Sequence, residues 1–91
     1  MKAATIFFER ETVRALLPGS AWWNIRGTKR WTTYVLRGLD GTVVYVGASG
    51  DIRQRLLEHI ADGRPAHSVE LEFHDSPSIM TRREKELIAL L

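Results

Sequence analysis

Residues 31–49 have the sequence WTTYVLRGLDGTVVYVGAS, and this stretch predicts a central β-hairpin. Two segments rich in β-branched and aromatic side chains flank the turn-forming sequence GLDG. A two-residue turn would pair Tyr34 with Tyr45 or with Gly47, and either register leaves both tyrosines on one face. A three-residue loop would separate them. We expect the shared face.

The helix predicted after this hairpin carries two polar side chains beside its buried stripe. Asp51 is a suitable N-cap, Gln54 completes a capping-box pattern, and Gly63 is placed to end the helix at C′. The stripe consists of apolar residues four positions apart, Ile52, Leu56 and Ile60. Arg55 and His59 are also four apart, so they are neighbours at the border of this stripe.

The last third of the chain predicts a strand and a helix with an unusual carboxylate. Residues 68–74 alternate apolar and polar, as in a strand with one buried face. Ser76 and Pro77 predict the start of the final helix. Its apolar positions are Met80, Leu87, Ile88 and Leu91. Glu84 lies inside that stripe, where a carboxylate must be paired, protonated or bound to a cation.

The first third of the chain is less regular. Residues 5–8 predict a short strand or the lead into a helix, and residues 9–17 predict a short helix. We expect residues 1–30 to form an N-terminal extension packed on a domain of residues 31–91. The expected fold is of the α/β (α+β) class, a small three-stranded antiparallel sheet flanked by helices.

Composition narrows the class of protein. Ninety-one residues, 44% of them hydrophobic, allow one domain with a modest core. The chain has no Cys, which excludes disulfides and thiolate zinc sites. No apolar run approaches the roughly 18 residues of a membrane span, and no signal peptide is recognisable. We therefore expect a cytoplasmic protein without membrane contact.

The basic residues are unevenly distributed although the formal net charge is only +2. Contact with a polyanion depends on where cations lie rather than on net charge. The candidates for nucleic-acid binding flank the first strand of the hairpin or lie in the following helix: Lys29, Arg30, Arg37 and Arg53. Taken alone, such cations more often belong to a solvated surface than to a binding site.

The ordered set of motifs resembles the GIY-YIG nuclease domain over roughly residues 32–91. The first motif is Thr32-Thr33-Tyr34 and the second is Tyr45-Val46-Gly47. Three further positions follow in the family's order: its arginine, a His or Tyr, and a metal-binding glutamate. In this chain they are Arg55, His59 and Glu84.

The resemblance implies a metal-dependent DNA endonuclease. Glu84 would hold one Mg²⁺ or Mn²⁺, and Arg55 would bind a non-bridging phosphate oxygen. Tyr34 would deprotonate or orient the attacking water, with a pKa lowered by nearby cations. Tyr45 and His59 would position the phosphate and the water, and His59 is a second candidate for proton transfer. DNA is the implied partner, and a homodimer or a larger nuclease partner would be compatible.

Each residue taken singly also has a structural interpretation. The tyrosines could form a cross-strand pair, Arg55 and Glu84 an ion pair, and His59 an ordinary satisfied histidine. The first motif lacks the family's Gly and Ile, and the Asn-containing tail of many members is absent. These departures favour a non-catalytic nucleic-acid-binding module. A third alternative is a protein-interaction domain that docks a larger nuclease through residues 22–23, a pair of tryptophans.

Overall fold

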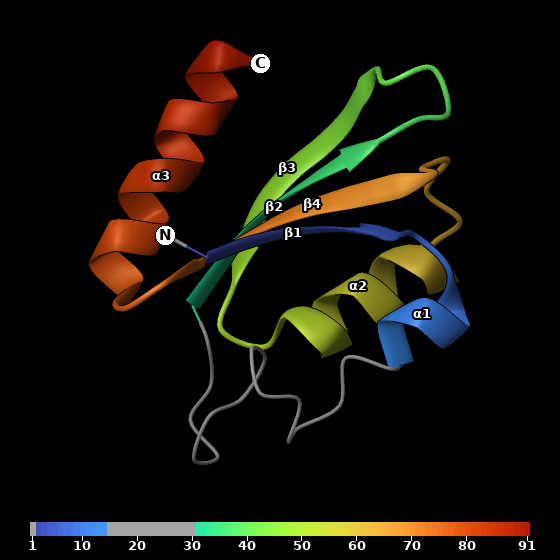
Figure 1. Ribbon diagram of the computed structural model, residues 1–91, viewed down its shortest axis with the longest axis horizontal. Helices are drawn as coiled ribbons and strands as arrows, with labels where there is room; N and C mark the ends of the chain where they lie inside the picture. The colour runs from blue at the N-terminus through green and yellow to red at the C-terminus, as the bar shows by residue number, and fades with distance from the viewer. Residues whose placement is uncertain (1, 15–30) are drawn as a thin grey trace.

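The computed structural model describes residues 2–14 and 31–91 and contains one antiparallel sheet (Figure 1). Its strands are β1 (Lys2–Phe7), β2 (Trp31–Arg37), β3 (Val43–Ser49) and β4 (Ser68–His74), in the spatial order β1-β4-β2-β3. The predicted α+β class is confirmed, but the sheet has four strands rather than three. The fourth arises because β1 pairs with β4, from Lys2 opposite Phe73 to Phe7 opposite Ser68.

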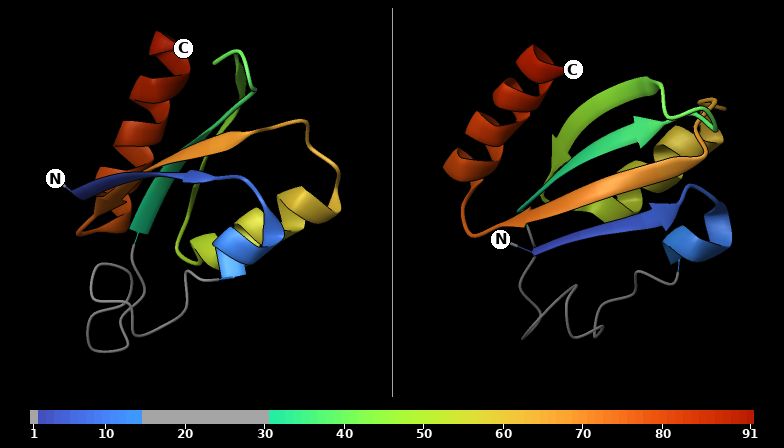
Figure 2. Two further views of the ribbon diagram at one scale, coloured as in Figure 1. Left: turned by 45° about the vertical axis from the view of Figure 1, so that its right-hand side comes forward. Right: turned by 45° about the horizontal axis from the view of Figure 1, so that its top comes forward.

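Helices cover the two faces of the sheet unequally (Figures 1 and 2). α1 (Arg10–Arg14) and α2 (Ile52–Ala61) pack on one face, and α3 (Pro77–Leu90) packs on the other. The main core lies under α1 and α2, and its buried residues are Val13, Tyr34, Leu36, Ile52, Leu56, Val69, Leu71 and Phe73. The face toward α1 and α2 is therefore the more deeply buried one.

Both predicted N-caps are present. The Asp51 carboxylate accepts a hydrogen bond of 3.4 Å from the backbone N–H of Gln54 at the start of α2. The Ser76 hydroxyl accepts one of 3.2 Å from the N–H of Ile79 at the start of α3. These bonds satisfy donors that the first helical turn leaves unpaired.

The hairpin places both tyrosines on one face by an unexpected route. The chain turns through residues 39–41, and the N–H of Gly38 donates to the carbonyl of Thr42 over 2.8 Å. This is the three-residue loop that was expected to separate the tyrosines. A β-bulge after Leu36 shifts the register by one residue and restores the shared face. As a result Tyr34 pairs with Gly47, and Leu36 pairs with Tyr45.

The apolar stripe predicted for α3 is only partly buried. Leu87 is buried against the sheet, whereas Ile88 and Leu91 are 58% and 52% exposed. α3 contacts β2, β3 and β4, and Leu87 is the residue that it buries within the described part of the chain. None of the helices in residues 2–14 and 31–91 is long and apolar enough to cross a membrane.

Candidate active site

Two tyrosines and a histidine form a buried cluster between the hairpin and α2. Tyr34 is only 1% exposed, and its Oη lies 2.8 Å from His59 Nε2. The rings of Tyr34 and Tyr45 stack with centroids 6.0 Å apart, and the His59 ring lies 4.7 Å from that of Tyr45. The hairpin register and the α2 stripe together therefore bring Tyr34, Tyr45 and His59 into contact, as the sequence predicted.

Gly47 provides the space that the Tyr34 ring occupies. A Cβ atom at this position would lie 2.5 Å from both Cζ and Oη of Tyr34. Real atoms do not approach so closely, so any side chain here would displace the phenol. The Tyr-x-Gly spacing of the second motif thus has a steric reason. Tyr45 supplies a ring that stacks on Tyr34, and Gly47, two positions on, leaves room for the Tyr34 ring.

Arg64 joins this cluster, although the sequence analysis gave it no role. Its Nε donates a 2.8 Å hydrogen bond to His59 Nδ1, and its guanidinium carbon lies 4.5 Å from the centroid of the Tyr45 ring. A charge over an aromatic face at this distance is a cation–π contact. The only signal available in the sequence was Gly63, which ends α2 and turns the chain back toward the helix.

Arg55 lies beside the phenols and remains exposed. Its Nη1 donates to the Glu58 carboxylate one turn along α2 at 3.2 Å. The pKa of the Arg55 guanidinium is raised, first by its interaction with the Tyr34 phenol and then by Glu58 and Tyr45. Because this side chain is exposed, it can still reach an anion in solution.

The predicted lowering of the Tyr34 pKa is wrong. Burial of the phenol raises its pKa to about 12 and outweighs the opposing effect of Arg55. The charges of Tyr45 and Glu84 contribute smaller increases. Tyr34 is therefore a protonated phenol at neutral pH, and the field of Glu84 reaches it across the sheet.

Glu84 differs from its neighbours on α3. It is half-buried, and neither a hydrogen bond nor an ion pair joins it to any other described residue. Glu86, two positions on, pairs with Arg83 at 3.4 Å. The ion pair between Arg55 and Glu84, which was the structural alternative for these two residues, is not formed. Arg55 pairs with Glu58 instead.

Two of the four candidate nucleic-acid-binding residues, Arg37 and Arg53, lie within the part of the chain that the structure describes. Arg37 lies on the α3 face, where its Nε donates to Glu70 at 2.7 Å and its Nη1 to the carbonyl of Gly41 at 2.8 Å. Arg53 is half-buried on α2, and its Nε finds no hydrogen-bond partner within the part of the chain that the structure describes. Residues 29 and 30, like the tryptophans at 22 and 23, lie outside the described residues. DNA contact by these cations stays a prediction.

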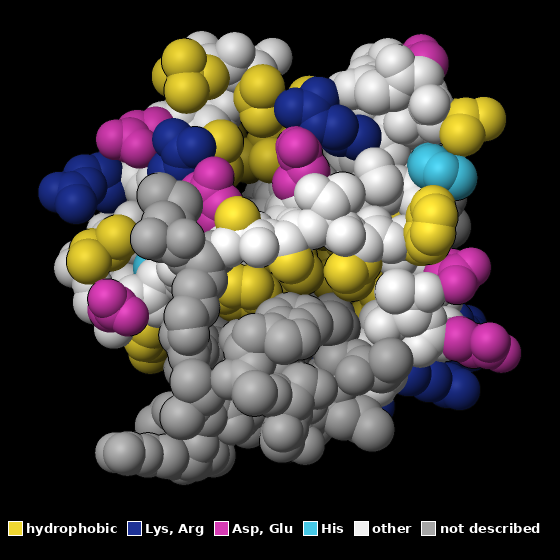
Figure 3. Space-filling view, in the orientation of Figure 1, with side chains coloured by type: hydrophobic (Ala, Val, Ile, Leu, Met, Phe, Trp, Pro, Cys, Tyr) yellow, Lys and Arg dark blue, Asp and Glu magenta, His cyan; other side chains and the backbone are white. Residues whose placement is uncertain are grey.

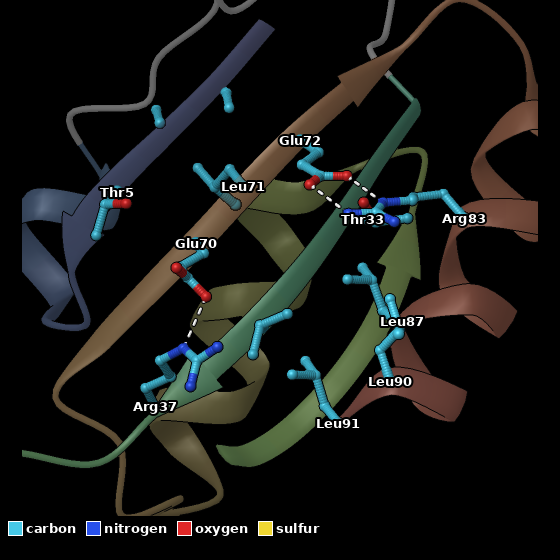
Figure 4. Close-up of a pocket in the computed structure, with 13 residues that line it drawn as sticks. Thr5, Thr33, Arg37, Glu70, Leu71, Glu72, Arg83, Leu87, Leu90 and Leu91 are labelled. Carbon is cyan, nitrogen blue, oxygen red and sulfur yellow. Dashed lines mark hydrogen bonds and ion pairs between the residues drawn. The ribbon is translucent and has the colours of Figure 1, made fainter. Parts of the chain in front are cut away.

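A cavity lined by described residues lies on the opposite face of the sheet from the tyrosines. It measures about 600 Å³ and lies between the strands and α3 (Figure 4). Its charged side chains are paired, Arg37 with Glu70 and Arg83 with Glu72. On the face seen in Figure 3, basic and acidic side chains are likewise interspersed. The candidate site is therefore the cluster around Tyr34, not this cavity.

Comparison with known proteins agrees with this geometry. The profile of the GIY-YIG catalytic domain matches residues 30–91, which contain every residue of the cluster. The searches of curated proteins and of solved structures each returned no match. Since the matched segment covers well over half of the chain, this protein belongs to the GIY-YIG family of nuclease-type catalytic domains.

Proposed function

We propose that this protein is a metal-dependent endonuclease that hydrolyses phosphodiester bonds in DNA. The observation that carries the proposal is the convergence of Tyr34, Tyr45 and His59 beside the exposed guanidinium of Arg55. All four stand in the order of the family's motifs within the matched segment. Hydrolysis of a phosphodiester requires a positioned water and compensation of charge on the phosphoryl oxygens, and these groups can supply both.

The residues fit a site for one divalent cation. The structure describes no group of three or more His, Cys, Asp or Glu side chains that could enclose a metal. Mg²⁺ rarely uses such an enclosure, because it keeps several waters and takes one or two carboxylates together with substrate phosphate. Glu84 is a half-buried carboxylate with no partner among the described residues, so it is the natural ligand. When bound there, Mg²⁺ or Mn²⁺ would offset negative charge on the phosphate and on the leaving oxygen.

The side chains of the cluster then have separable roles. Arg55 binds a non-bridging phosphate oxygen through its exposed guanidinium. Tyr34 has a pKa of about 12 and therefore acts as a protonated phenol that orients the water. Tyr45 stacks on Tyr34, packs at a tilt against His59, and keeps both rings in place.

The test is nicking of supercoiled plasmid in the presence of Mg²⁺ or Mn²⁺. The wild type is expected to cut only when the cation is present, and Glu84→Gln is expected to abolish cutting. Glu86→Gln is the matched control, because it removes a nearby carboxylate of the same helix that pairs with Arg83. Full activity of Glu84→Gln would rule out the mechanism.

A second candidate is a non-catalytic nucleic-acid-binding module, and the burial of Tyr34 favours it. A phenol that is 1% exposed cannot touch a substrate without some movement of its surroundings. This function predicts salt-sensitive DNA binding, no cleavage with any divalent cation, and no effect of Glu84→Gln on affinity. A filter-binding titration at two salt concentrations, run beside the nicking assay, separates the two candidates.

A further inference from the structure

The end of α2 determines where Arg64 lies. Gly63 has a φ of 74°, and its N–H donates to the carbonyl of Ile60 at 3.0 Å. The N–H of Arg64 donates to the carbonyl of His59 at 3.2 Å. This pair of bonds is a Schellman motif, which reverses the chain at a helix C-terminus. It brings Arg64 back beside His59, five positions earlier in the sequence.

The contact between these two side chains determines where the proton of the imidazole lies. Arginine has only donor groups, so the 2.8 Å bond from Arg64 Nε requires an unprotonated Nδ1 on His59. Burial and the charges of Arg64 and Arg55 lower the pKa of His59, which is therefore neutral at neutral pH. A neutral imidazole with a bare Nδ1 carries its proton on Nε2.

This tautomer fixes the direction of the next hydrogen bond. His59 Nε2–H must donate to Tyr34 Oη, 2.8 Å away. The phenol oxygen is then an acceptor toward His59, and its own proton is free for another partner. With the opposite tautomer, Nε2 would accept the phenol proton, and the Tyr34 hydroxyl would point toward the histidine.

We propose that Arg64 is a positioning residue that holds His59 as the Nε2–H tautomer and thereby turns the Tyr34 hydroxyl proton away from the histidine. Its guanidinium, stacked over the Tyr45 ring, also holds that ring in place. The consequence for catalysis rests on the proposed nuclease function, whereas the tautomer itself does not. In this arrangement both nitrogens of His59 are engaged, so His59 does not act as the proton acceptor that the sequence analysis considered.

The direct test is nitrogen NMR of ¹⁵N-labelled protein at a pH well above the ordinary histidine pKa of about 6.5. Long-range proton–nitrogen spectra distinguish the two neutral tautomers, and a His59→Gln spectrum assigns the signal among the three histidines. We expect the Nε2–H pattern in the wild type. We expect it also in Arg64→Lys, which keeps a side chain with donors only, and its loss in Arg64→Met. An Nδ1–H pattern in the wild type, or an unchanged pattern in Arg64→Met, would overturn the proposal.

Steady-state kinetics distinguish a positioning role of Arg64 from direct contact with the phosphate. Arg64→Met is expected to lower kcat about tenfold or more, the scale seen when a group that orients an active-site histidine is removed, and to leave KM nearly unchanged. Arg82→Met is the matched control, since Arg82 is an exposed cation on α3. A raised KM with an unchanged kcat would contradict the positioning role. If no variant, including the wild type, cleaves DNA, the nuclease function fails while the NMR result still decides the tautomer.

Discussion

The two faces of the sheet each contain a buried histidine, and the partners of these histidines differ. His74, on the α3 face, lies 2.9 Å from the hydroxyl of Thr33, and the ion pair Arg83–Glu72 is among the charges that act on it. His59, on the α2 face, is bound by a cation and in turn contacts a phenol. Burial lowers the pKa of both.

Under the proposed function, the α2 face is the functional one and the α3 face is structural. On the α3 face, the ion pairs Arg37–Glu70 and Arg83–Glu72 are partly buried, so their charges are engaged within the protein. On the α2 face, Arg55 pairs with Glu58 at the exposed surface, with 46% and 48% of the two side chains accessible. Glu84, on α3, has no pairing partner among the described residues. Of the motif residues, Tyr34, Tyr45 and His59 lie together on the α2 face, whereas Thr33 of the first motif contacts His74 on the α3 face. Both faces therefore draw on the same strand, β2.

The largest expected effect is on the nicking rate, and it comes from removing the guanidinium of the α2 face, with its counterpart on the α3 face as the comparison. Arg55→Ala should lower the nicking rate about 100- to 1,000-fold, because it deletes a donor to the charge that develops on the phosphate. Arg83→Ala should leave the rate unchanged and lower the free energy of unfolding by about 1 kcal/mol, through loss of its two bonds to Glu72 at 2.7 and 3.1 Å. Plasmid nicking and urea unfolding of both variants check this. Equal effects on the nicking rate would erase the distinction between the faces.

A smaller change tests the steric role of Gly47. Gly47→Ala would force the Tyr34 ring to move, since the added Cβ would lie 2.5 Å from the phenol. We expect a loss of about 1–3 kcal/mol in unfolding free energy together with reduced nicking. Gly38→Ala, in the same hairpin, is the control, because its nearest atom is an exposed Asp40 oxygen at 3.2 Å that can move aside. A Gly47→Ala protein as stable and active as the wild type would refute the tight packing.

The smallest expected effect is the pH dependence of stability. Histidines with a lowered pKa in the folded state take up protons more readily when unfolded, so stability is full above about pH 6.5 and falls as the pH drops toward the folded pKa values. The free energy of unfolding should change by no more than about 1.4 kcal/mol per pH unit for each histidine. Urea unfolding between pH 7.5 and about pH 5 measures it, above the range where Glu72 is protonated. His74→Gln should reduce the slope without affecting nicking, and a slope of opposite sign would contradict the assignment of neutral, buried rings.

Most of the fold could be predicted because its signals are local. Turn residues, strand alternation and the two N-caps indicated the hairpin, β4, α2 and α3. The strand β1 was ambiguous because its partner is β4, more than 60 positions away, and no local pattern encodes that pairing. The β-bulge after Leu36 was likewise hidden, since it depends on how the loop and the strands fit together.

The contact among three of the candidate side chains could be predicted from the sequence, whereas the electrostatics of the cluster could not. The parity of the hairpin and the spacing of α2 brought Tyr34, Tyr45 and His59 together, as predicted. The Tyr34 pKa was predicted in the wrong direction because the sequence shows nearby cations but not the depth of burial. Arg64 was missed because its placement depends on the reversal of the chain at Gly63, and no motif of the family marked it.

The most direct test of the proposed site is a crystal of the protein soaked in Mn²⁺ with a short DNA duplex. We predict anomalous density beside the Glu84 carboxylate, next to a phosphate within reach of Arg55, and none at the paired carboxylates Glu70 and Glu72. Density that avoids Glu84, or that appears equally at the paired carboxylates, would contradict the assignment of Glu84 as the metal ligand.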